Sequence, residues 1–453
     1  MRALLSRALP ILLLLALADG AGAGENTRLN TAEYDADDYG CIGDDATDDS
    51  ACLQAVIDAA IAGGGGVVRF ARRYKITSAL ILDAKGPNVR IWIRGDGART
   101  SHIRQAAPGA DVLVVGRTSC ECADNAKVSD LTLKAGRYAL RLNNALHGLF
   151  QNLDITGGST VGIYMEGQNE RHVFQNIEIS GSTRNGILVG QSNGVCAGPL
   201  DNPELQKAVF ENIRIAGTTD GPAFRITAGL CDGTQQVSGD ITIRHLLLES
   251  NKQGGLYIAH AGLGVTVTRV TTEDQPDRDA TYSAIQTEAT PSVVYITDSH
   301  LANNTSHGNR YKYFINHTSG EAFIQGVSTG GSPATSADIR FADSGSVVSS
   351  TLVGGTTSGL LIDGDSPIGR VTVSDLRDSA GRIILGGRTD TPIACGAQNV
   401  GLSYYDADRR ALCYCDNGAG SYRWCPVTDM KRCWRGSAVD CGTPRRSRSR
   451  SLP

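Results

Sequence analysis

The sequence predicts an all-β protein built as a parallel β-helix, a solenoid in which short strands stack coil upon coil. The main observation is a repeat, because residues 149–155 (LFQNLDI) return as residues 173–179 (VFQNIEI) and as residues 209–215 (VFENIRI). Short strands of alternating apolar residues, separated by Gly, Ser and Thr turns at a period of a few dozen residues, are typical of solenoids. No such coil can bury its apolar face alone, so each must stack on its neighbours.

The repeated asparagine has a physical role in this stack. Asn152, Asn176 and Asn212 hold the same position in the three copies, and each amide can bond to the equivalent amide one coil away. A further coil, residues 241–246, carries His245 at this position. We expect coils over residues 67–388. Two insertions, at residues 191–207 and 273–283, interrupt the period, and insertions in solenoids often lie on the binding face.

The first residues of the chain predict export. Arg2 and Arg7 precede an apolar run over residues 10–18, and Ala21-Gly22-Ala23 offers a small-residue cleavage site. We therefore expect a signal peptide over residues 1–23 and a secreted protein, extracellular or periplasmic. The run is too short to span a bilayer, and no later segment is long and apolar enough to do so. The net charge of −4 does not indicate a nucleic-acid partner.

Twelve cysteines in an exported chain predict disulfides. Cys41 with Cys52, and Cys196 with Cys231, are candidate local pairs, although spacing does not fix the connectivity. The cluster in residues 413–441 lacks the paired C-x-x-C spacing of zinc sites, so we expect an oxidised Cys-rich module over residues 392–442. Residues 443–453, with four Arg among Ser, are expected to be disordered.

A second informative stretch precedes the coils. Apolar residues at helical spacing predict a helix over Leu53–Ala60, with Asp48 or Asp49 at its N-terminus, and the glycines of residues 63–66 end it before a strand begins at Val67. The pattern over residues 38–70 (DYGCIGDDATDD…LQAVIDAA…GGGVVRF) resembles the start of pectate-lyase-superfamily, pectin-lyase-like proteins. That resemblance implies a right-handed, single-stranded parallel β-helix with an N-terminal helical cap, here residues 24–66. Residues 401–424 resemble the small module that closes some of these proteins.

The resemblance also implies a substrate groove along the strand that contains Gly-Ile-x-x, after the ladder asparagine. Side chains alternate along a strand, so the outward residues of these strands can be predicted. Aromatic faces stack on sugars, Arg binds carboxylates, and Glu or Asp serves as acid or base. We expect substrate-binding roles for Tyr164, Glu166, Tyr257, Glu249, Gln286 and Arg340.

Two mechanisms fit such a groove. A hydrolase needs two carboxylates about 5 to 9.5 Å apart, and Glu288 with Asp277 or Asp279 is the best pair. A lyase needs a cation or an Arg to neutralise a uronate and a base to take the ring proton, for which Arg225, His260 and Tyr257 are candidates. The N-T-D … D-D … G-H-G … R-I-K series of polygalacturonases and the Trp-Ile-Asp-His segment of pectate lyases are both missing.

These observations leave the activity open. We expect a polysaccharide-active protein, a lyase or a glycoside hydrolase that acts on an acidic polysaccharide. The alternative is a non-catalytic glycan-binding or adhesin-like surface protein on the same rod, and a homo-oligomer is compatible with either. No metal site is assigned. Ca²⁺ is the one cofactor that the acidic residues of the cap allow, although structural roles in turns and at helix ends are commoner for such residues.

Overall fold

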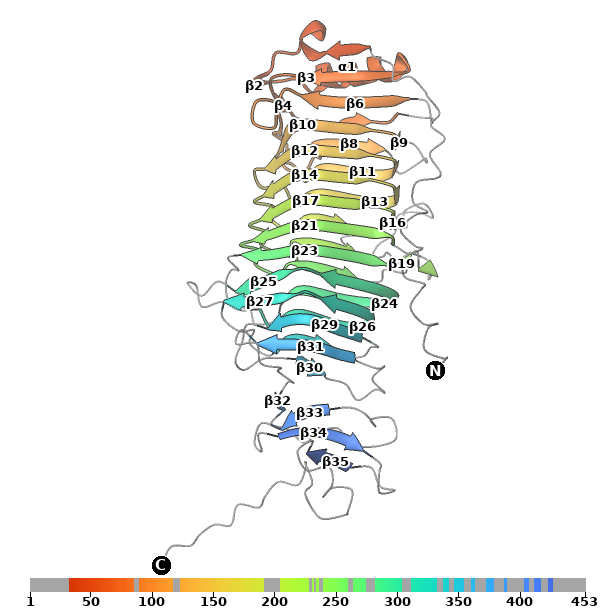
Figure 1. Ribbon diagram of the computed structural model, residues 1–453. Helices are drawn as coiled ribbons and strands as arrows, with labels where there is room; N and C mark the ends of the chain where they lie inside the picture. Colours follow the sequence, from red (N-terminus) through yellow and green to blue (C-terminus); the bar gives the residue numbers. More distant parts are fainter. Residues whose placement is uncertain are drawn as a thin grey trace, which may run out of the picture.

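The structure is a computed structural model, and it forms a straight stack of coils from α1 to β31 (Figure 1). It describes residues 32–84, 89–116, 123–190, 204–227, 230–231, 234–235, 239–259, 264–273, 282–303, 311–331, 337–341, 346–353, 360–362, 372–378, 387–388, 403–406, 411–416 and 423–426. One large sheet, in which every pairing between strands is parallel, contains all strands from β1 to β31 except the short hairpin of β19 (Leu230–Cys231) and β20 (Thr234–Gln235).

Each full coil contributes strands to three faces. Face 1 contains β5 (Leu80–Leu82), β8 (Leu113–Gly116), β11 (Tyr138–Leu146), β13 (Val161–Glu170), β15 (Asn185–Val189), β18 (Phe224–Thr227), β22 (Leu256–Ala259), the first part of β24 (Ser283–Thr297), the first part of β26 (Tyr313–Gln325), β28 (Ala337–Phe341) and β30 (Leu360–Ile362). Two short strands, β9 (Ala123–Asp124) and β16 (Glu204–Gln206), pair with the ends of β11 and β13.

Faces 2 and 3 share most of their strands, which bend at one residue between the two faces. Face 2 begins with β1 (Glu33–Asp35), β3 (Gly65–Phe70) and β6 (Arg90–Gly95), and face 3 begins with β2 (Asp44–Asp48), β4 (Arg73–Ile76) and β7 (His102–Gln105). The bent strands are β10 (Lys127–Lys134), β12 (Leu149–Thr156), β14 (Val173–Ser180), β17 (Val209–Ala216), β21 (Ile241–Glu249) and β23 (Val265–Glu273). The last coils add β25 (His300–Asn303), β27 (Ser328–Gly331), β29 (Ser346–Val353) and β31 (Thr372–Asp378).

The expected asparagine ladder stands at the bend between faces 2 and 3. The Nδ2 of Asn176 donates to the Oδ1 of Asn152 at 3.1 Å, and the Nδ2 of Asn212 donates to the Oδ1 of Asn176 at 3.0 Å. All three residues have a positive φ of 53–54°, which asparagine tolerates better than most residues do. His245 holds the same position with φ 53°, so its predicted place in the ladder is confirmed.

Apolar side chains fill the interior of the rod from the first coil to Ile339. Phe150, Phe174 and Phe210 stack through successive coils, with ring centroids 5.0 and 4.6 Å apart. Because these phenylalanines hold the same place in the three sequence repeats, the repeat positions one ring above another in the core. His172 lies fully buried beside this stack, and burial lowers its pKa to about 3, so its imidazole is neutral.

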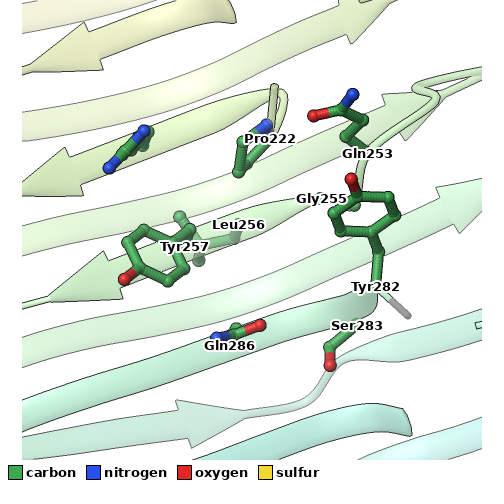
Figure 2. A pocket seen from close by; sticks show the side chains of 10 residues that line it. Pro222, Gln253, Gly255, Leu256, Tyr257, Tyr282, Ser283 and Gln286 are labelled. Carbon is green, nitrogen blue, oxygen red and sulfur yellow. The ribbon is translucent and has the colours of Figure 1, made fainter. Parts of the chain in front are cut away.

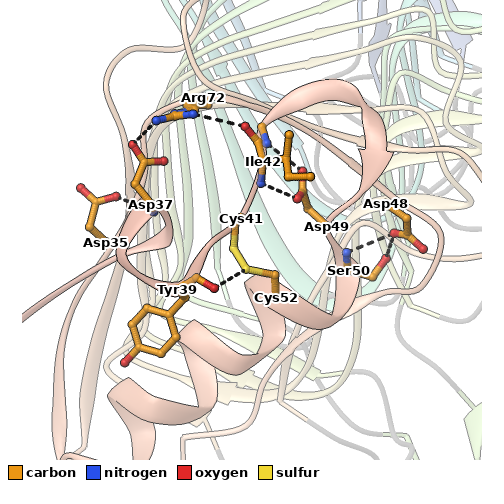
Figure 3. Close-up of a disulfide and its surroundings, with 11 residues drawn as sticks. Asp35, Asp37, Tyr39, Cys41, Ile42, Asp48, Asp49, Ser50, Cys52 and Arg72 are labelled. Carbon is orange, nitrogen blue, oxygen red and sulfur yellow. Dashed lines mark hydrogen bonds and ion pairs between the residues drawn. A yellow bond between two sulfur atoms is a disulfide. The ribbon is translucent and has the colours of Figure 1, made fainter.

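The helix α1 (Ser50–Ala62) lies at the end of the rod where the chain begins, next to the short 3-10 helix η1 (Ala36–Tyr39) (Figure 1). Leu53, Val56, Ile57 and Ala60 of α1 are buried in the common core. A disulfide joins Cys41 to Cys52, with their Cα atoms 5.5 Å apart, and ties the preceding loop to α1 (Figure 3).

Two features of this end differ from expectation. Asp49 stands at the N-cap of α1 but makes no cap bond, because its carboxylate accepts from the backbone N–H groups of Ile42 and Gly43 at 2.8 and 3.0 Å. In addition, β1 and β2 already pair with later strands, so the sheet begins before Val67. These two strands join through their backbones and bury few side chains, which explains why apolar alternation did not reveal them.

Four strands near the C-terminus form a sheet of their own, β32 (Gly387–Arg388), β33 (Ser403–Asp406), β34 (Ala411–Asp416) and β35 (Arg423–Pro426). The last three are antiparallel, unlike the coils. The expected Cys-rich module, residues 392–442, contains β33, β34 and β35 of this sheet. Residues 1–31 and 443–453, where we expected the signal peptide and a disordered tail, lie outside the described residues, as does Cys196 of the second candidate disulfide.

Candidate functional site

Face 1 carries the outward side chains that the sequence predicted. Ile187, Phe224, Leu256 and Ile285 are buried in the core, so the residues that follow them point outward. Backbone register aligns those outward residues from coil to coil. We name this series the outer column: Val114, Arg141, Tyr164, Leu188, Arg225, Tyr257, Gln286, Asn316 and Arg340.

A pocket of about 210 Å³ opens on this face between the outer column and the turns that precede its strands (Figure 2). From the outer column it takes Arg225, Tyr257 and Gln286. Its remaining lining residues come from the turns and strand starts: Pro222, Gln253, Gly254, Gly255, Leu256, Tyr282 and Ser283. The pocket therefore combines three consecutive coils, which is how a solenoid brings distant sequence segments together.

Tyr257, Glu288 and Gln286 form one hydrogen-bonded group beside the pocket. The Tyr257 hydroxyl donates to Oε2 of Glu288 at 2.6 Å, and Nε2 of Gln286 donates to Oε1 of Glu288 at 2.5 Å. Both carboxylate oxygens are thus held in a fixed orientation. Burial, together with the bond to Glu288, raises the pKa of Tyr257 well above its usual value, so the phenol keeps its proton at neutral pH.

Arg225 is the cation of the pocket. Its guanidinium lies over the ring of Tyr257, 5.4 Å from the ring centroid, and this face-on contact is a favourable cation–π geometry. Its Nε is buried without a hydrogen-bond partner, and no carboxylate pairs with Arg225 among the described residues. An unpaired, partly buried guanidinium is a strong binding group for an anion, above all for a planar carboxylate.

Tyr164 and Glu166 lie on face 1 but not in the pocket. Tyr164 is 4 % exposed and packs against Tyr138, with ring centroids 4.4 Å apart, so the prediction of an open stacking platform at Tyr164 is wrong. Neighbouring side chains cover it because Tyr138, Val161 and Leu188 form an apolar cluster on the outside of the sheet. Glu166 pairs with Arg141 and accepts from Asn143 at 3.0 Å, so its charge is already neutralised.

Glu249 stands on another face. It ends β21 on face 3, where its carboxylate binds Arg214 at 2.5 Å, so the predicted place beside the groove is wrong. The turn after Glu249 carries the chain to face 1 only at Leu256. Arg340 does lie in the outer column, where Nη1 donates to Oδ1 of Asn316 at 3.2 Å and the guanidinium lies 5.4 Å from the Tyr313 ring centroid.

Three predicted catalytic residues, Asp277, Asp279 and His260, lie outside the described residues. Conversely, the structure adds residues to the site that the alternation along the strands did not identify, namely Pro222, Gln253, Tyr282 and Ser283. Pro222, Gln253 and Tyr282 precede the strands, where no period applies, and Ser283 is the first residue of β24. The glycine pair Gly254-Gly255 was the available signal, since neighbouring small residues in one turn open space for a ligand.

The acidic residues of the first coil have structural partners. Asp48 accepts from the backbone N–H and the hydroxyl of Ser50 and from Thr77, while Asp45 binds Arg104 at 2.7 Å. Asp49 binds the loop as described above. Within the described ranges, no group of three or more His, Cys, Asp or Glu is arranged to hold a metal ion. The same residues include no helix long and apolar enough to cross a membrane.

A second, shallower groove of about 460 Å³ lies on face 3 beside the asparagine ladder. Asp154 and Glu178 are neighbours there in register, and Arg214 joins Glu178 to Glu249. Burial, together with the charge of Glu178, raises the pKa of Asp154. Of the two arginines that line this groove, Arg99 and Arg214, the second is already paired with two carboxylates.

Comparisons with known proteins support the fold. No protein-family model matches the chain. One curated relative, mannuronan C5-epimerase AlgE1 of Azotobacter vinelandii, is 32% identical over 133 residues, which are 26% of this chain and 9% of that protein.

Among solved structures, the catalytic domain of Agl-KA has a TM-score of 0.53 at 13% identity and covers 77% of this chain and 68% of its own. The A-module of mannuronan C-5 epimerase AlgE6 from Azotobacter vinelandii has a TM-score of 0.52 at 14% identity, over 76% of this chain and 99% of its own. DFA-IIIase from Arthrobacter chlorophenolicus A6 has a TM-score of 0.53 at 10% identity, over 80% and 100%. At such identities the likeness shows the fold.

Proposed function

From the premise that the chain is a right-handed parallel β-helix of the pectin-lyase type, we propose that it binds an acidic polysaccharide in the face-1 pocket and removes the ring proton beside a uronate carboxyl group. This proton transfer is the first step of both polysaccharide lyases and C5-epimerases. One observation carries the proposal: the unpaired guanidinium of Arg225 lies next to an oriented acid–base pair, Tyr257 and Glu288.

Arg225 supplies the recognition of the substrate. A uronate places a carboxylate on the carbon that bears the proton to be removed, and Arg binds carboxylates with two parallel hydrogen bonds. When that proton leaves, negative charge spreads into the carboxylate, and a nearby fixed cation stabilises the developing charge. Arg225 thus binds the ground state and stabilises the transition state with the same group.

Tyr257 and Glu288 supply the proton transfer. The phenol is protonated at rest, so it becomes a base only when its proton passes along the existing 2.6 Å hydrogen bond to Glu288. The Tyr257 oxygen then accepts the proton as the C5–H bond breaks, and the electrons of that bond enter the carboxylate-stabilised carbanion. In a lyase, a C4=C5 double bond forms and O4 leaves with the proton from this pair. In an epimerase, a water molecule on the other face of the ring gives a proton to C5, and the hydroxide left behind takes the extra proton from the Tyr257–Glu288 pair.

A hydrolase fits the described residues less well. It needs a second carboxylate near Glu288, and the outer column contains no Asp or Glu among the described residues. The similarity to a protein named a mannuronan epimerase supports a uronate polymer rather than a neutral glycan. The expected leader over residues 1–23 and the Cys41–Cys52 disulfide support a role outside the cytoplasm.

The test is incubation with oligomannuronate and other acidic glycans in D₂O. Deuterium incorporation at C5 detects proton removal that is followed by reprotonation, as in an epimerase, and ultraviolet absorption detects the unsaturated end that a lyase leaves. Tyr257→Phe should lower the rate about 10²- to 10⁴-fold, because acid–base groups contribute about that much. Tyr164→Phe is the matched control, since it removes the same hydroxyl from the buried tyrosine of the same outer column.

Other outcomes contradict the proposal in different ways. New reducing ends without deuterium or an unsaturated product would indicate a hydrolase that uses Glu288 with Asp277 or Asp279. Tight binding of the glycan without any reaction would indicate the non-catalytic glycan-binding alternative. Absence of both binding and reaction with every acidic glycan would remove the face-1 assignment altogether.

A further inference from the structure

The pocket exists because one row of side chains becomes small at this point of the rod. We name two runs of residues in register at the start of face 1 the edge row: Tyr138, Val161 and Asn185, and then Gly254, Ser283, Tyr313 and Ala337. In register, Tyr138 pairs with Val161, and Ser283 pairs with Tyr313. Gly254 faces the Ser283 backbone so closely that a Cβ there would stand 2.9 Å from the Ser283 carbonyl oxygen.

The large members of the edge row fill their coils. Val161 packs with Tyr164 and Leu188 in the outer cluster, Tyr138 packs against that cluster, and Tyr313 lies under the guanidinium of Arg340. At the pocket the row offers only Gly254 and Ser283, and Tyr282 stands beside Ser283 at the rim (Figure 2). The space that large side chains occupy in other coils is therefore available to a ligand here.

Two polar atoms of the lining residues lack partners. The Oγ of Ser283 and the Nε of Arg225 are both buried without a hydrogen bond, and Ser283 as a whole is 4 % exposed. Buried polar groups almost always have a partner, and an unpaired one costs about 1 to 3 kcal/mol. Both of these unpartnered atoms belong to residues that line the same pocket. We take this to indicate that a bound ligand completes both hydrogen bonds.

From these observations we infer that Ser283 is a specificity-determining residue, which binds a free ring hydroxyl of the sugar whose carboxylate Arg225 holds. The inference rests on the proposed function. A serine hydroxyl donates one hydrogen bond and accepts others, and an alcohol does the same, so the two groups are complementary. A carboxylate is better matched by the guanidinium, which only donates.

The inference includes a discrimination against substituted sugars. An O-acetyl group removes the donor of the ring hydroxyl and adds volume in a pocket of about 210 Å³ that is walled by Tyr257 and Tyr282. A site that is built to hydrogen-bond a hydroxyl rejects ligands that leave its buried polar group unpaired. The protein should therefore prefer unsubstituted uronate units to acetylated ones.

The experiment compares Ser283→Ala with the wild type in two measurements, thermal unfolding and titration with oligomannuronate, unsubstituted and O-acetylated. Removing an orphaned hydroxyl breaks no protein contact, so the Tm should stay equal or rise. Affinity for the unsubstituted glycan should fall about three- to tenfold, the value of one net hydrogen bond. The preference for unsubstituted over acetylated glycan should shrink by the same factor or more.

Ser299→Ala is the matched control. Ser299 is equally buried, but its hydroxyl accepts from the Val270 N–H at 3.1 Å and donates to the Thr297 carbonyl at 3.0 Å. This variant should lower the Tm and leave both affinities unchanged. A Ser283→Ala variant that loses Tm as Ser299→Ala does, and binds both glycans as the wild type does, would show that Ser283 is only structural.

The two proposals fail separately in this experiment. Wild-type affinity for oligomannuronate with no change in Ser283→Ala removes the role of Ser283 and leaves the proposed function in place. A wild type that binds neither glycan removes the proposed function and the role of Ser283 together. Equal affinity of the wild type for unsubstituted and O-acetylated oligomannuronate would contradict the proposed discrimination against acetylated sugars.

Discussion

The outer column of face 1 has a closed half and an open half, although both halves hold the same register positions. In the closed half, Arg141 lies between Asp111 and Glu166, and Tyr164 and Leu188 are buried by neighbouring side chains. In the open half, Arg225 has no carboxylate partner among the described residues and Tyr257 lies at the pocket. Both halves place an arginine next to a tyrosine, and only the surroundings decide which pair is structural.

The two halves differ in whether their charged side chains are paired and in whether neighbouring side chains cover the outer column. Asp111 is 4 % exposed and accepts from Arg137 at 2.9 and 3.1 Å and from Arg141 at 3.1 Å, so the closed half balances its charges internally. Large edge-row residues, Tyr138 and Val161, then cover the column. The open half lacks both the counter-charge and the cover. A pattern of residue types along one face therefore does not identify a binding site unless the partners of each residue are also known.

The largest expected effect comes from removing the two arginines in parallel. Arg141→Ala should destabilise the protein by about 3 kcal/mol, because it removes the cation of the partly buried Glu166 and one of the two cations of the buried Asp111, which keeps Arg137. Arg225→Ala should leave stability nearly unchanged and should abolish preferential binding of a uronate over a neutral glycan. Chemical denaturation measures the first effect, and titration with matched acidic and neutral oligosaccharides measures the second. Equal destabilisation by Arg141→Ala and Arg225→Ala would mean that Arg225 is a structural residue like Arg141 and is not free to bind a ligand.

The two tyrosines give a smaller contrast of the same kind. Tyr164→Ala should cost about 3 kcal/mol, since it leaves a cavity beside Tyr138 and Leu188. Tyr257→Ala should weaken glycan binding by roughly one or two decades, because a stacked ring contributes about 1 to 3 kcal/mol of apolar contact. Its effect on stability should be small, since Tyr257 points away from the core that Leu256 and Ile258 fill. If Tyr257→Ala lost stability and its folded fraction bound glycan like the wild type, Tyr257 would be a structural residue and not a ligand-binding one.

The sequence was sufficient for the fold because stacking is a periodic constraint. The asparagine at the bend and the phenylalanine inside the coil must recur once per coil, so three copies identify the architecture. The outward direction of Arg225, Tyr257 and Gln286 follows from the same period. Tyr164 was misjudged because outward does not mean exposed: whether an outward ring is covered depends on neighbours in other coils, here Tyr138 and Leu188.

The turn residues of the site escaped prediction for a different reason. Gln253 and Tyr282 lie in turns, where the alternation of a strand does not apply, and Ser283 is the first residue of its strand, where the alternation only begins. Glu249 was misplaced because the turn that follows it is long enough to separate faces 3 and 1. Glu288 was already a candidate from the sequence, but its bonds to Tyr257 and Gln286 cross between coils or depend on rotamers, so only the folded structure reveals them.

The smallest expected effect concerns acid stability at the N-terminal end of the rod, where α1 lies. Hydrogen bonds from Ser50 and then from Thr77 lower the pKa of Asp48 from 3.8 to about 2. A carboxyl group whose pKa is lower in the folded state stabilises the fold when it is ionised. This contribution is therefore fully present above pH 3.8 and is lost as the pH falls through about 2. The group is exposed, so we expect a shift in Tm smaller than that of either preceding variant.

Asp48→Asn tests this assignment. The amide keeps one acceptor for Ser50 but cannot ionise, so the variant should have a lower Tm than the wild type at pH 5, and the two curves should converge near pH 2. Thermal unfolding between pH 2 and pH 5 measures the difference. Asp38→Asn is the control, because Asp38 is exposed and makes no side-chain bond within the described part of the chain. A gap between wild type and Asp48→Asn that stays constant over this range would show that the bonds to Ser50 and Thr77 do not depend on the charge. The N-terminal end of the rod would then owe its stability to the Cys41–Cys52 disulfide and the buried face of α1 rather than to its ionised carboxylates.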